Sequence, residues 1–289
     1  MAPQSSPTVK RRRLAAELRH YRDAAGLTID DVAERLEWSS AKISRIENSR
    51  VSVLPRDVKF LLGVYGLTDA DEAWNVMLTL ARESRERGWW HQYGDAVPDW
   101  FEVYVGLEAD AASIDAYDAE FVPGLIQTED YARAITRAKL SDVTEDDLAR
   151  IVGVRMKRQD LLTATDGPHV WFVINEAVLR RLVGGRAVMR RQLERLLEVA
   201  DLPRVQLQIV PFEAGAHPSM DGSFSILAFP ESRDPQVVYT EYLTGALYLE
   251  KPSDTDRYRL VVDHLRATAA GMDASRALIA GIAGQLDDP

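Results

Sequence analysis

The sequence predicts an α+β protein, with an all-α N-terminal domain followed by a domain built on a mainly antiparallel or mixed sheet. Two patterns along the chain predict this class. Apolar residues recur at helical spacing as far as about residue 87, whereas short runs of alternating apolar residues follow one another from His169 onward. At 289 residues the chain is also long enough for two domains.

Five helices are expected in the N-terminal domain. The first runs from about Thr8 to Ala25, the fourth begins at Pro55, and the fifth covers Asp69 to about Arg87. The second and third helices are short and amphipathic. The side chains expected on the inner face of the fifth helix are Ala73, Val76, Met77, Leu80 and Ala81.

Residues 27–50 have the layout of two short helices joined by a tight turn, which is typical of a helix-turn-helix. Thr28 can cap the first of these helices and Ser39 the second, in which Ile43 and Ile46 point inward. A second helix of this kind enters the major groove of DNA with its N-terminal residues at the base edges. The outward positions of this helix are therefore candidates for reading DNA.

Arg45 is the strongest candidate reader among the outward side chains. Its guanidinium can bond bidentately to guanine, a contact worth about 1–3 kcal/mol of discrimination. The alternative is a plain three-helix packing unit, because Ile and Leu at helical spacing usually form a core. The consistent register of caps, turn and outward arginine favours the DNA reader.

Residues 27–50 resemble the helix-turn-helix of the Xre/Cro-type phage repressors, including the ISRIENSR segment at residues 43–50 that closes the recognition helix. The resemblance implies that Arg22 of the first helix pairs with Glu47. Ile29 departs from the pattern, because that position is usually polar, so a contact to the DNA backbone is either missing or replaced by the Thr28 hydroxyl and nearby helix N-terminal amides, which can bind phosphate. The residues implied at base edges are Ser40, Ala41 and Arg45, those at the groove wall are Lys42 and Ser44, and those at phosphates are Asn48 and Arg50; with Thr28 and Ser39 they form the predicted DNA-binding set.

Basic charge is concentrated at the N-terminus. Residues 1–66 carry 12 Lys and Arg against 8 Asp and Glu, whereas the remaining residues carry 23 against 37, within a net charge of −10. A basic DNA-binding domain followed by an acidic second domain fits this distribution. The alternative is that the acidic surface serves only solubility. The run Lys10 to Arg13 is expected either to contact the DNA backbone or to be a solvated helix start.

The chain has no cysteine, which excludes disulfides, thiolate catalysis and cysteine-based metal sites. No apolar run approaches the ~20 residues that a membrane helix needs, and the N-terminus lacks the apolar core of a signal peptide. A cytoplasmic protein without membrane contact is therefore expected.

Three segments are expected to divide the chain: a helix-turn-helix domain with its supporting helix at 1–87, an aromatic connector at 88–104, and a regulatory, partner-binding or dimerisation domain at 105–289. The connector is expected to be a packed interdomain or subunit interface, with the lining of a ligand pocket as the alternative. Its aromatic residues are Trp89, Trp90, Tyr93, Trp100, Phe101 and Tyr104.

Helices and strands are expected to mix in the second domain. The expected helices are Leu107–Ala119, one that opens at Thr128, Thr144–Thr163, Arg186–Val199, Pro252–Thr268 and Asp273–Ala283. The expected strands are His169–Ile174, Arg204–Val210, Ser223–Phe229, Gln236–Thr240 and Ala246–Leu249.

Segments of this domain such as VPGLIQTEDYARA, INEAVLRRLVGG and IVPFEAGAHPSMDGSF resemble the C-terminal domain of an actinobacterial group of Xre-type regulators described as antitoxin-like. The resemblance implies small partner proteins encoded nearby and a role in the control of development and secondary metabolism.

Catalytic and metal chemistry are weakly indicated. The Gly184–Arg186 turn could bind an anion, and His217 with Asp221 could share a metal or a proton, but turns and single loop histidines usually have structural roles. Glu176 and Glu241 lie near strand ends and are expected to cap and form salt bridges. No enzyme activity, metal or cofactor is therefore predicted.

The predicted function is a sequence-specific transcriptional regulator that binds an inverted-repeat operator in double-stranded DNA as a homodimer. The C-terminal domain would supply dimerisation, a site for a small protein partner encoded nearby, or both. A small-molecule sensor and an antitoxin-like interaction module are the alternatives. The residues considered for a ligand or partner site are Trp89, Trp90, Trp171 and His217.

Overall fold

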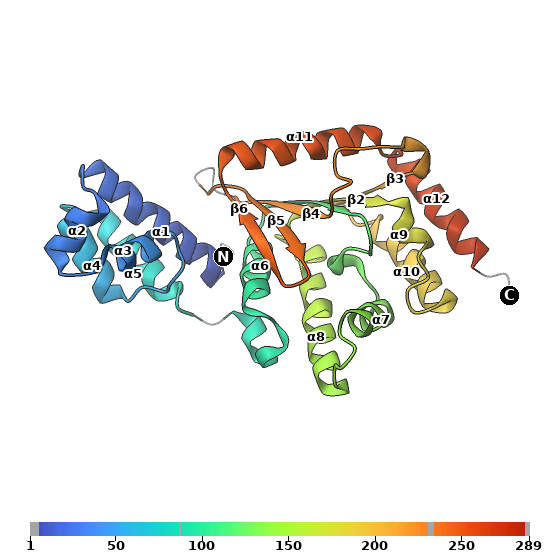
Figure 1. Ribbon diagram of the computed structural model, residues 1–289, viewed down its shortest axis with the longest axis horizontal. Coiled ribbons are helices and arrows are strands. Elements are labelled where there is room, and N and C mark those ends of the chain that lie inside the picture. Colours follow the sequence, from blue (N-terminus) through green and yellow to red (C-terminus); the bar gives the residue numbers. More distant parts are fainter. Residues whose placement is uncertain (1–5, 87, 231–233, 287–289) are drawn as a thin grey trace. The chain divides into compact units, whose positions relative to one another are not determined.

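The computed structural model describes residues 6–86, 88–230 and 234–286 (Figure 1). The chain forms two compact units, Met1–His91 and Gln92–Pro289. The first is helical and the second contains helices and a mixed sheet, so the predicted α+β class is confirmed. Among the described residues, no helix is long and apolar enough to cross a membrane.

The first unit contains five helices, as the sequence predicts. Glu37 ends the second of them in the left-handed conformation, with φ of 54°, and so makes the tight turn before the third. Thr28 and Asp31 form the capping box of that second helix, while the Ser39 hydroxyl accepts from the Lys42 amide. The helices are α1 (Pro7–Ala24), α2 (Ile29–Leu36), α3 (Ser40–Glu47), α4 (Pro55–Val64) and α5 (Glu72–Glu83).

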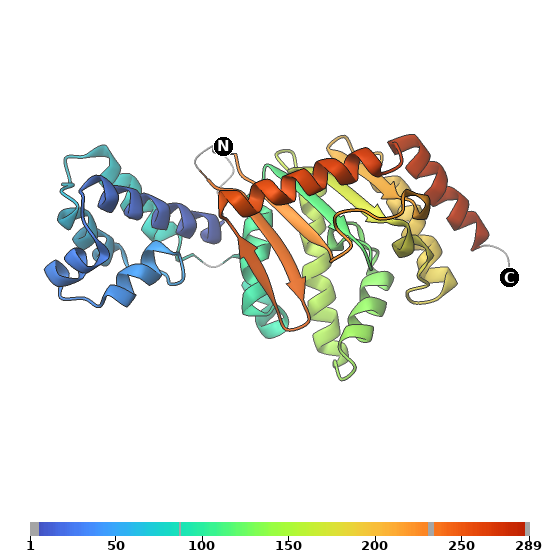
Figure 2. The same ribbon diagram turned by 45° about the horizontal axis from the view of Figure 1, so that its top comes forward.

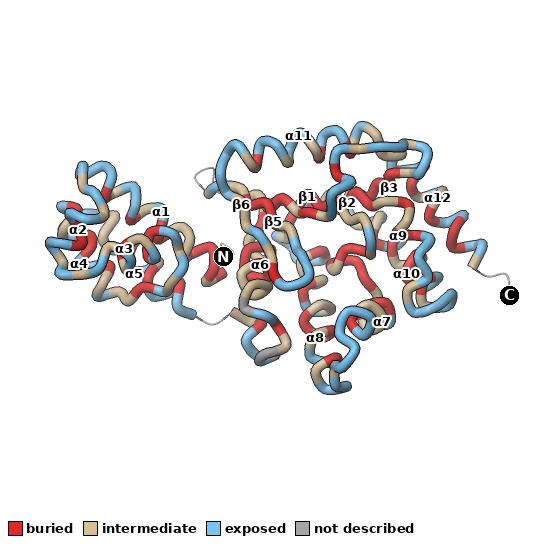
Figure 3. Tube along the Cα trace, viewed as in Figure 1, coloured by how far each residue is buried: buried red, intermediate tan, exposed pale blue. Residues whose placement is uncertain are grey.

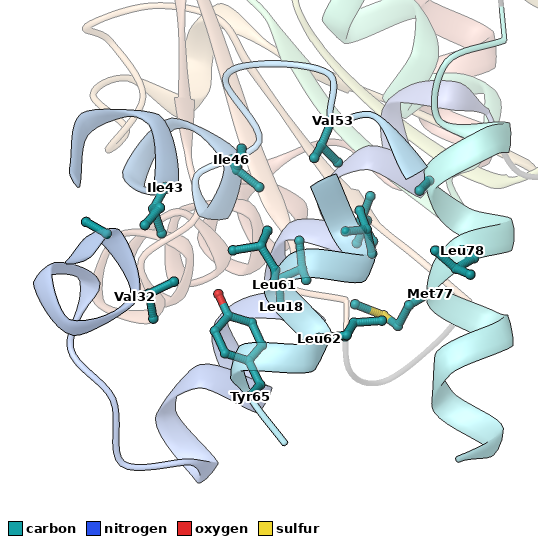
Figure 4. Close-up of a cluster of buried hydrophobic side chains, with 14 residues drawn as sticks. Leu18, Val32, Ile43, Ile46, Val53, Leu61, Leu62, Tyr65, Met77 and Leu78 are labelled. Carbon is teal, nitrogen blue, oxygen red and sulfur yellow. The ribbon is translucent and has the colours of Figure 1, made fainter. Parts of the chain in front are cut away.

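One apolar core joins these five helices (Figure 4). Val32 of α2, Ile43 of α3 and Leu61 of α4 are fully buried in it, which fixes the helix-turn-helix against its support. The inner face predicted for α5 is wrong at Val76, which is 49% exposed, whereas Leu78 is buried. The helix begins at Glu72, three residues later than expected, and it turns Leu78 rather than Val76 toward the core.

The second unit is built around a six-stranded sheet in the order β3-β2-β1-β4-β5-β6. The strands β1, β2 and β3 run parallel to one another, whereas β4 is antiparallel to β1, β5 to β4, and β6 to β5. The sheet is therefore mixed. The strands are β1 (Ser113–Asp118), β2 (His169–Asn175), β3 (Val205–Val210), β4 (Phe224–Ala228), β5 (Val237–Tyr242) and β6 (Gly245–Leu249).

Helices cover both faces of this sheet (Figure 1). On one face α11 packs through Val262 and Leu265 against Tyr117, Phe224 and Val238. The helices α6 and α8 lie on the other side, and α12 lies beside β3. The helices of this unit are α6 (Asp99–Ala109), α7 (Glu129–Lys139), α8 (Glu145–Arg158), α9 (Glu176–Arg180), α10 (Arg186–Val199), α11 (Pro252–Thr268) and α12 (Met272–Gln285); 3-10 turns are η1 (Trp89–Ala96), η2 (Gly124–Ile126), η3 (Gln159–Leu162) and η4 (Phe212–Ala214).

The helix predicted over Leu107–Ala119 is wrong in its second half. The helix α6 ends at Ala109, and residues 113–118 form β1, the strand that lies between β2 and β4. Hydrogen bonding to strands on both sides outweighs the helical tendency of the alanines in this segment. The other five predicted strands are confirmed within a few residues.

Candidate DNA-binding surface

The third helix presents a polar face to solvent and an apolar face to the core. Ile43, Ile46 and Glu47 are buried, whereas Ala41 and Arg45 are exposed. Of the other predicted DNA contacts, Thr28, Ser39, Asn48 and Arg50 are exposed and Ser40, Lys42 and Ser44 are half-buried. The predicted set therefore lies at the exposed edge of the α2-turn-α3 unit and within the segment that follows it.

A buried ion pair anchors the end of α3 to α1. Arg22 Nε lies 2.9 Å from Glu47 Oε1 and its Nη2 lies 3.0 Å from Glu47 Oε2, a bidentate arrangement. The hydrogen bond to Glu47 raises the pKa of Arg22. Tyr65 donates to the same carboxylate at 3.3 Å, and burial, reinforced by Glu47, raises the pKa of that tyrosine. The Arg22–Glu47 pair implied by the resemblance is confirmed.

A polar contact joins the two helices of the helix-turn-helix at its surface. The Ser40 hydroxyl donates to Asp30 Oδ1 at 2.5 Å. Asp31 at the next position accepts from the Thr28 amide and hydroxyl at 2.8 and 2.7 Å, and these bonds lower the pKa of its carboxyl group. Two carboxylates thus lie close to side chains predicted to contact DNA.

Two further members of the predicted set are held within the domain. Lys42 Nζ lies 3.2 Å from Asp57 Oδ2 of α4 and 3.2 Å from the centroid of the Trp38 ring. Asn48 donates through Nδ2 to the Ser44 carbonyl at 2.7 Å, which caps the end of α3. These contacts fix the two side chains next to the surface.

Arg45 differs from these residues in having no ion-pair partner in the described part of the chain, and its side chain is exposed. Sequence reasoning missed Asp30 and Asp57, the acidic residues that hold Ser40 and Lys42. Both acids lie in the first turns of their helices, a position that also suits acidic residues through the helix dipole, so the sequence did not distinguish a second role.

The basic run at the start of α1 is partly engaged inside the N-terminal unit. Lys10 Nζ lies 3.2 Å from Glu83 Oε2 of α5. The expectation of a solvated charge is therefore wrong for this lysine, because an acidic residue distant in sequence pairs with it, whereas DNA contact by the basic run stays a prediction.

Glycine and tryptophan pack closely in the connector. A Cβ atom placed on Gly88 would lie 2.3 Å from the Trp90 ring, and Trp90 is buried, with Trp89 edge-on to it at 6.0 Å between centroids. In the C-terminal unit, Tyr104 packs on Tyr239 with ring centroids 4.2 Å apart. These aromatic residues are packed against neighbours within each unit.

Trp171 and His217 of the second unit also have partners. Trp171 Nε1 donates to Gln208 Oε1 at 2.9 Å, and the Arg266 guanidinium lies 3.9 Å from the Trp171 ring centroid. His217 Nε2 lies 3.2 Å from the Tyr117 hydroxyl oxygen, and burial lowers the pKa of the imidazole, with His264 as the second cause. A ligand site at these residues stays a prediction.

The carboxylates near the strand ends are also engaged. Glu176 accepts from the Phe212 amide at 2.8 Å and from Arg180, while Glu241 accepts from Tyr239 and lies 3.5 Å from Lys139 Nζ. Across the described ranges, no group of three His, Asp or Glu side chains is placed to hold a metal ion.

The helical unit with its exposed α3 has the architecture of DNA-binding helix-turn-helix proteins. Residues 13–74 match the family described as a helix-turn-helix domain. Residues 101–281, more than half of the chain, match a second family, described as a domain of unknown function (DUF5753). The chain belongs to the DUF5753 family. No curated protein and no solved structure matches it.

Proposed function

We propose that the chain is a sequence-specific transcriptional regulator that reads DNA through α3. The observation that carries the proposal is Arg45, which is exposed on a helix whose opposite face is locked by Ile43, Ile46 and the buried Glu47. A rigid helix presents its arginine in a fixed direction, which base-specific hydrogen bonding requires. The Xre-type assignment belongs to this proposal and rests on the sequence resemblance.

The distribution of charge supports DNA binding by the first unit. Residues 1–66 carry a net charge of +4 from 12 basic and 8 acidic residues, and the rest of the chain carries −14 from 23 and 37. The acidic second unit is repelled by DNA phosphates. Contacts with DNA are therefore confined to the first unit, and the non-specific affinity for DNA stays low.

The regulator acts as a homodimer in this proposal. Helix-turn-helix dimers bind half-sites about 34 Å apart, one turn of DNA, so the operator is an inverted repeat. The DUF5753 region supplies oligomerisation and the input of a partner or signal. An antitoxin-like role, with a small partner protein encoded nearby, rests on the resemblance of this region and is the second form of the proposal.

Binding rather than catalysis is the proposed activity of the second unit. Its candidate catalytic groups, His217, Glu176 and Glu241, have hydrogen-bond or ion-pair partners within the chain. These contacts fit packing and capping roles.

Fluorescence anisotropy on DNA from the upstream region of the gene tests the proposal. Wild-type protein is expected to prefer this duplex over a scrambled one, and Arg45→Ala to lose about 1–3 kcal/mol of that preference. Arg195→Ala removes one positive charge from α10 of the second unit and serves as the matched control, with binding unchanged. Equal binding of both duplexes by the wild type would contradict sequence-specific reading of this DNA.

A further inference from the structure

We propose that the outer edge of β6 pairs antiparallel with β6 of a second copy of the chain, so that two sheets join across a twofold axis. The inference rests on the proposed function, because it names the interface of the proposed dimer. The β5–β6 hairpin lies at one edge of the sheet, with β6 outermost (Figure 2).

The register of the hairpin shows which main-chain groups of β6 are unpaired. Leu243 and Thr244 form a two-residue turn, so the flanking residues Tyr242 and Gly245 are a hydrogen-bonded pair. Antiparallel pairs alternate, which makes Leu247 and Leu249 hydrogen-bonded partners of β5 as well. The N–H and C=O groups of the two intervening residues, Ala246 and Tyr248, therefore point away from the sheet.

The described residues do not close this edge with main-chain hydrogen bonds. Within residues 6–86, 88–230 and 234–286, no main-chain hydrogen bond joins Ala246 or Tyr248 to a further strand or loop. The opposite edge of the sheet is engaged at Ile209 of β3, whose carbonyl accepts from the Ala270 amide at 2.8 Å and whose amide donates to the Ser275 hydroxyl at 3.0 Å. Within the described residues, the outward main-chain groups of Ile209 thus have partners, whereas those of Ala246 and Tyr248 do not.

The side chains of β6 do not protect its edge. Proteins usually block an exposed edge with charge or proline, but Gly245–Leu249 contains neither. Leu247 is 50% exposed, and at the end of the hairpin Tyr242 is 52% and Leu243 97% exposed. The tip of the β5–β6 hairpin is coloured as exposed in Figure 3. A short apolar strand with unpaired main-chain groups is suited to pairing with another strand.

The geometry points to a second copy as that strand. When β6 pairs antiparallel with itself, Ala246 faces Tyr248 of the second copy, and Tyr248 faces Ala246 of the second copy. Each facing pair exchanges two main-chain hydrogen bonds, so the same outward groups are used on both sides. Leu247 then lies on the twofold axis opposite Leu247 of the second copy, in a non-hydrogen-bonded pair whose side chains approach closely.

Charge directs self-pairing to this strand rather than to the rest of the surface. The chain beyond residue 66 carries 37 acidic against 23 basic residues, so two copies repel each other over most of their surface. The β6 strand is neutral and can be brought against its own copy without opposing like charges. An interface of one short strand is small, so the dimer is expected to dissociate on dilution.

Sedimentation equilibrium of the full-length chain tests this interface. The wild type is expected to show a concentration-dependent dimer, whereas Leu247→Lys and Leu247→Glu, which place like charges on the axis, each raise the dimer Kd by roughly tenfold or more. An equimolar mixture of the two variants is expected to restore dimers, because opposite charges then face each other. Leu182→Lys is the matched control: Leu182 is 48% exposed, lies outside the hairpin, and is expected to leave the Kd unchanged.

A wild type that is monomeric at every concentration would overturn the proposal, as would Leu247 variants that dimerise like the wild type. Anisotropy on a duplex with one half-site separates this inference from the proposed function. If Leu247→Lys is monomeric and still binds the half-site, both stand. If the wild type dimerises through β6 but no form of the protein binds specific DNA, the interface stands and the DNA-binding proposal fails.

Discussion

The Ser40 hydroxyl is a hydrogen-bond donor to Asp30 Oδ1 at 2.5 Å, and this bond joins the first residue of α3 to the second residue of α2. A hydroxyl has a single proton, so Ser40 can offer DNA only its acceptor lone pairs. In the major groove, adenine and cytosine present amino donors, whereas guanine and thymine present acceptors. Asp30 therefore restricts which bases Ser40 can bond in the proposed complex.

We expect Asp30→Ala to relax the base preference at the position that Ser40 contacts. The freed hydroxyl can donate or accept, so the discrimination lost is that of about one hydrogen bond, about 0.5–1.5 kcal/mol. Competition anisotropy with duplexes changed one base pair at a time measures it. Ser40→Ala should lose the same preference, and adding Asp30→Ala to it should have no further effect on specificity. An unchanged preference in Asp30→Ala would show that Ser40 does not read a base.

Asp57→Asn is expected to strengthen DNA binding. Asp57 holds Lys42 Nζ at 3.2 Å, and without this carboxylate the ammonium is available to a phosphate. One added phosphate contact steepens the dependence of log K on log salt concentration by about 0.9. Titrations at several salt concentrations measure the slope. Asp69→Asn makes the same charge change at an exposed position and should leave the slope as it is; a comparable steepening there would point to net charge as the cause.

Arg22→Ala is expected to destabilise the N-terminal unit by about 3–5 kcal/mol, because it leaves the Glu47 carboxylate buried without its cation. Urea unfolding followed by circular dichroism gives the free energy of unfolding. Arg19→Ala, at an exposed position of the same helix, should change that free energy little. Equal losses in the two variants would mean that the buried pair does not hold α1 to α3.

Asp118 at the end of β1 is expected to make the stability of the second unit depend on pH. Burial, together with the charge of Glu241 and against the opposing charge of Lys139, raises the pKa of Asp118 from 3.8 to about 7. Between about pH 4 and pH 7 the Asp118 carboxyl group is protonated in the folded chain and ionised in the unfolded chain. Its contribution to stability is therefore present below about pH 4 and is lost as the pH rises to about 7.

The variant Asp118→Asn carries an amide in place of the carboxyl group, so this side chain stays neutral at every pH considered. Above about pH 7 the variant is expected to exceed the wild type in free energy of unfolding by an amount on the order of 1–4 kcal/mol, with the difference shrinking toward pH 4. Urea unfolding across this pH range measures the difference. Asp142→Asn, an exposed change on the loop before α8, should follow the wild type at each pH.

Local signals in the sequence predicted most of the helical unit. Thr28 and Ser39 cap their helices as expected, because capping depends on residues a few positions apart. Long-range contacts were harder to predict. Asp57 holds Lys42, and Glu83 holds Lys10, across distances in sequence that no periodicity reveals. The lysines of the candidate site were therefore identified without the acids that restrain them.

The same limit explains the missed strand in the second unit. Residues 113–118 are short and follow an alanine-rich helix end, and their strand conformation depends on β2 and β4, which come later in the chain. The strand β6 was predicted from its sequence to within one residue. Its position at the edge of the sheet could not be predicted, because strand order is set by the assembled sheet.

The cap that α12 and the preceding segment place on β3 limits how far any assembly can grow. A sheet with two open edges can add neighbours at both ends and extend into a fibre, whereas a sheet with one open edge stops after a single addition. The Ser275 hydroxyl and the Ala270 amide occupy the β3 edge. If β6 pairs with a second copy as proposed, these two contacts at Ile209 hinder further addition at β3, and the assembly is expected to stop at two copies.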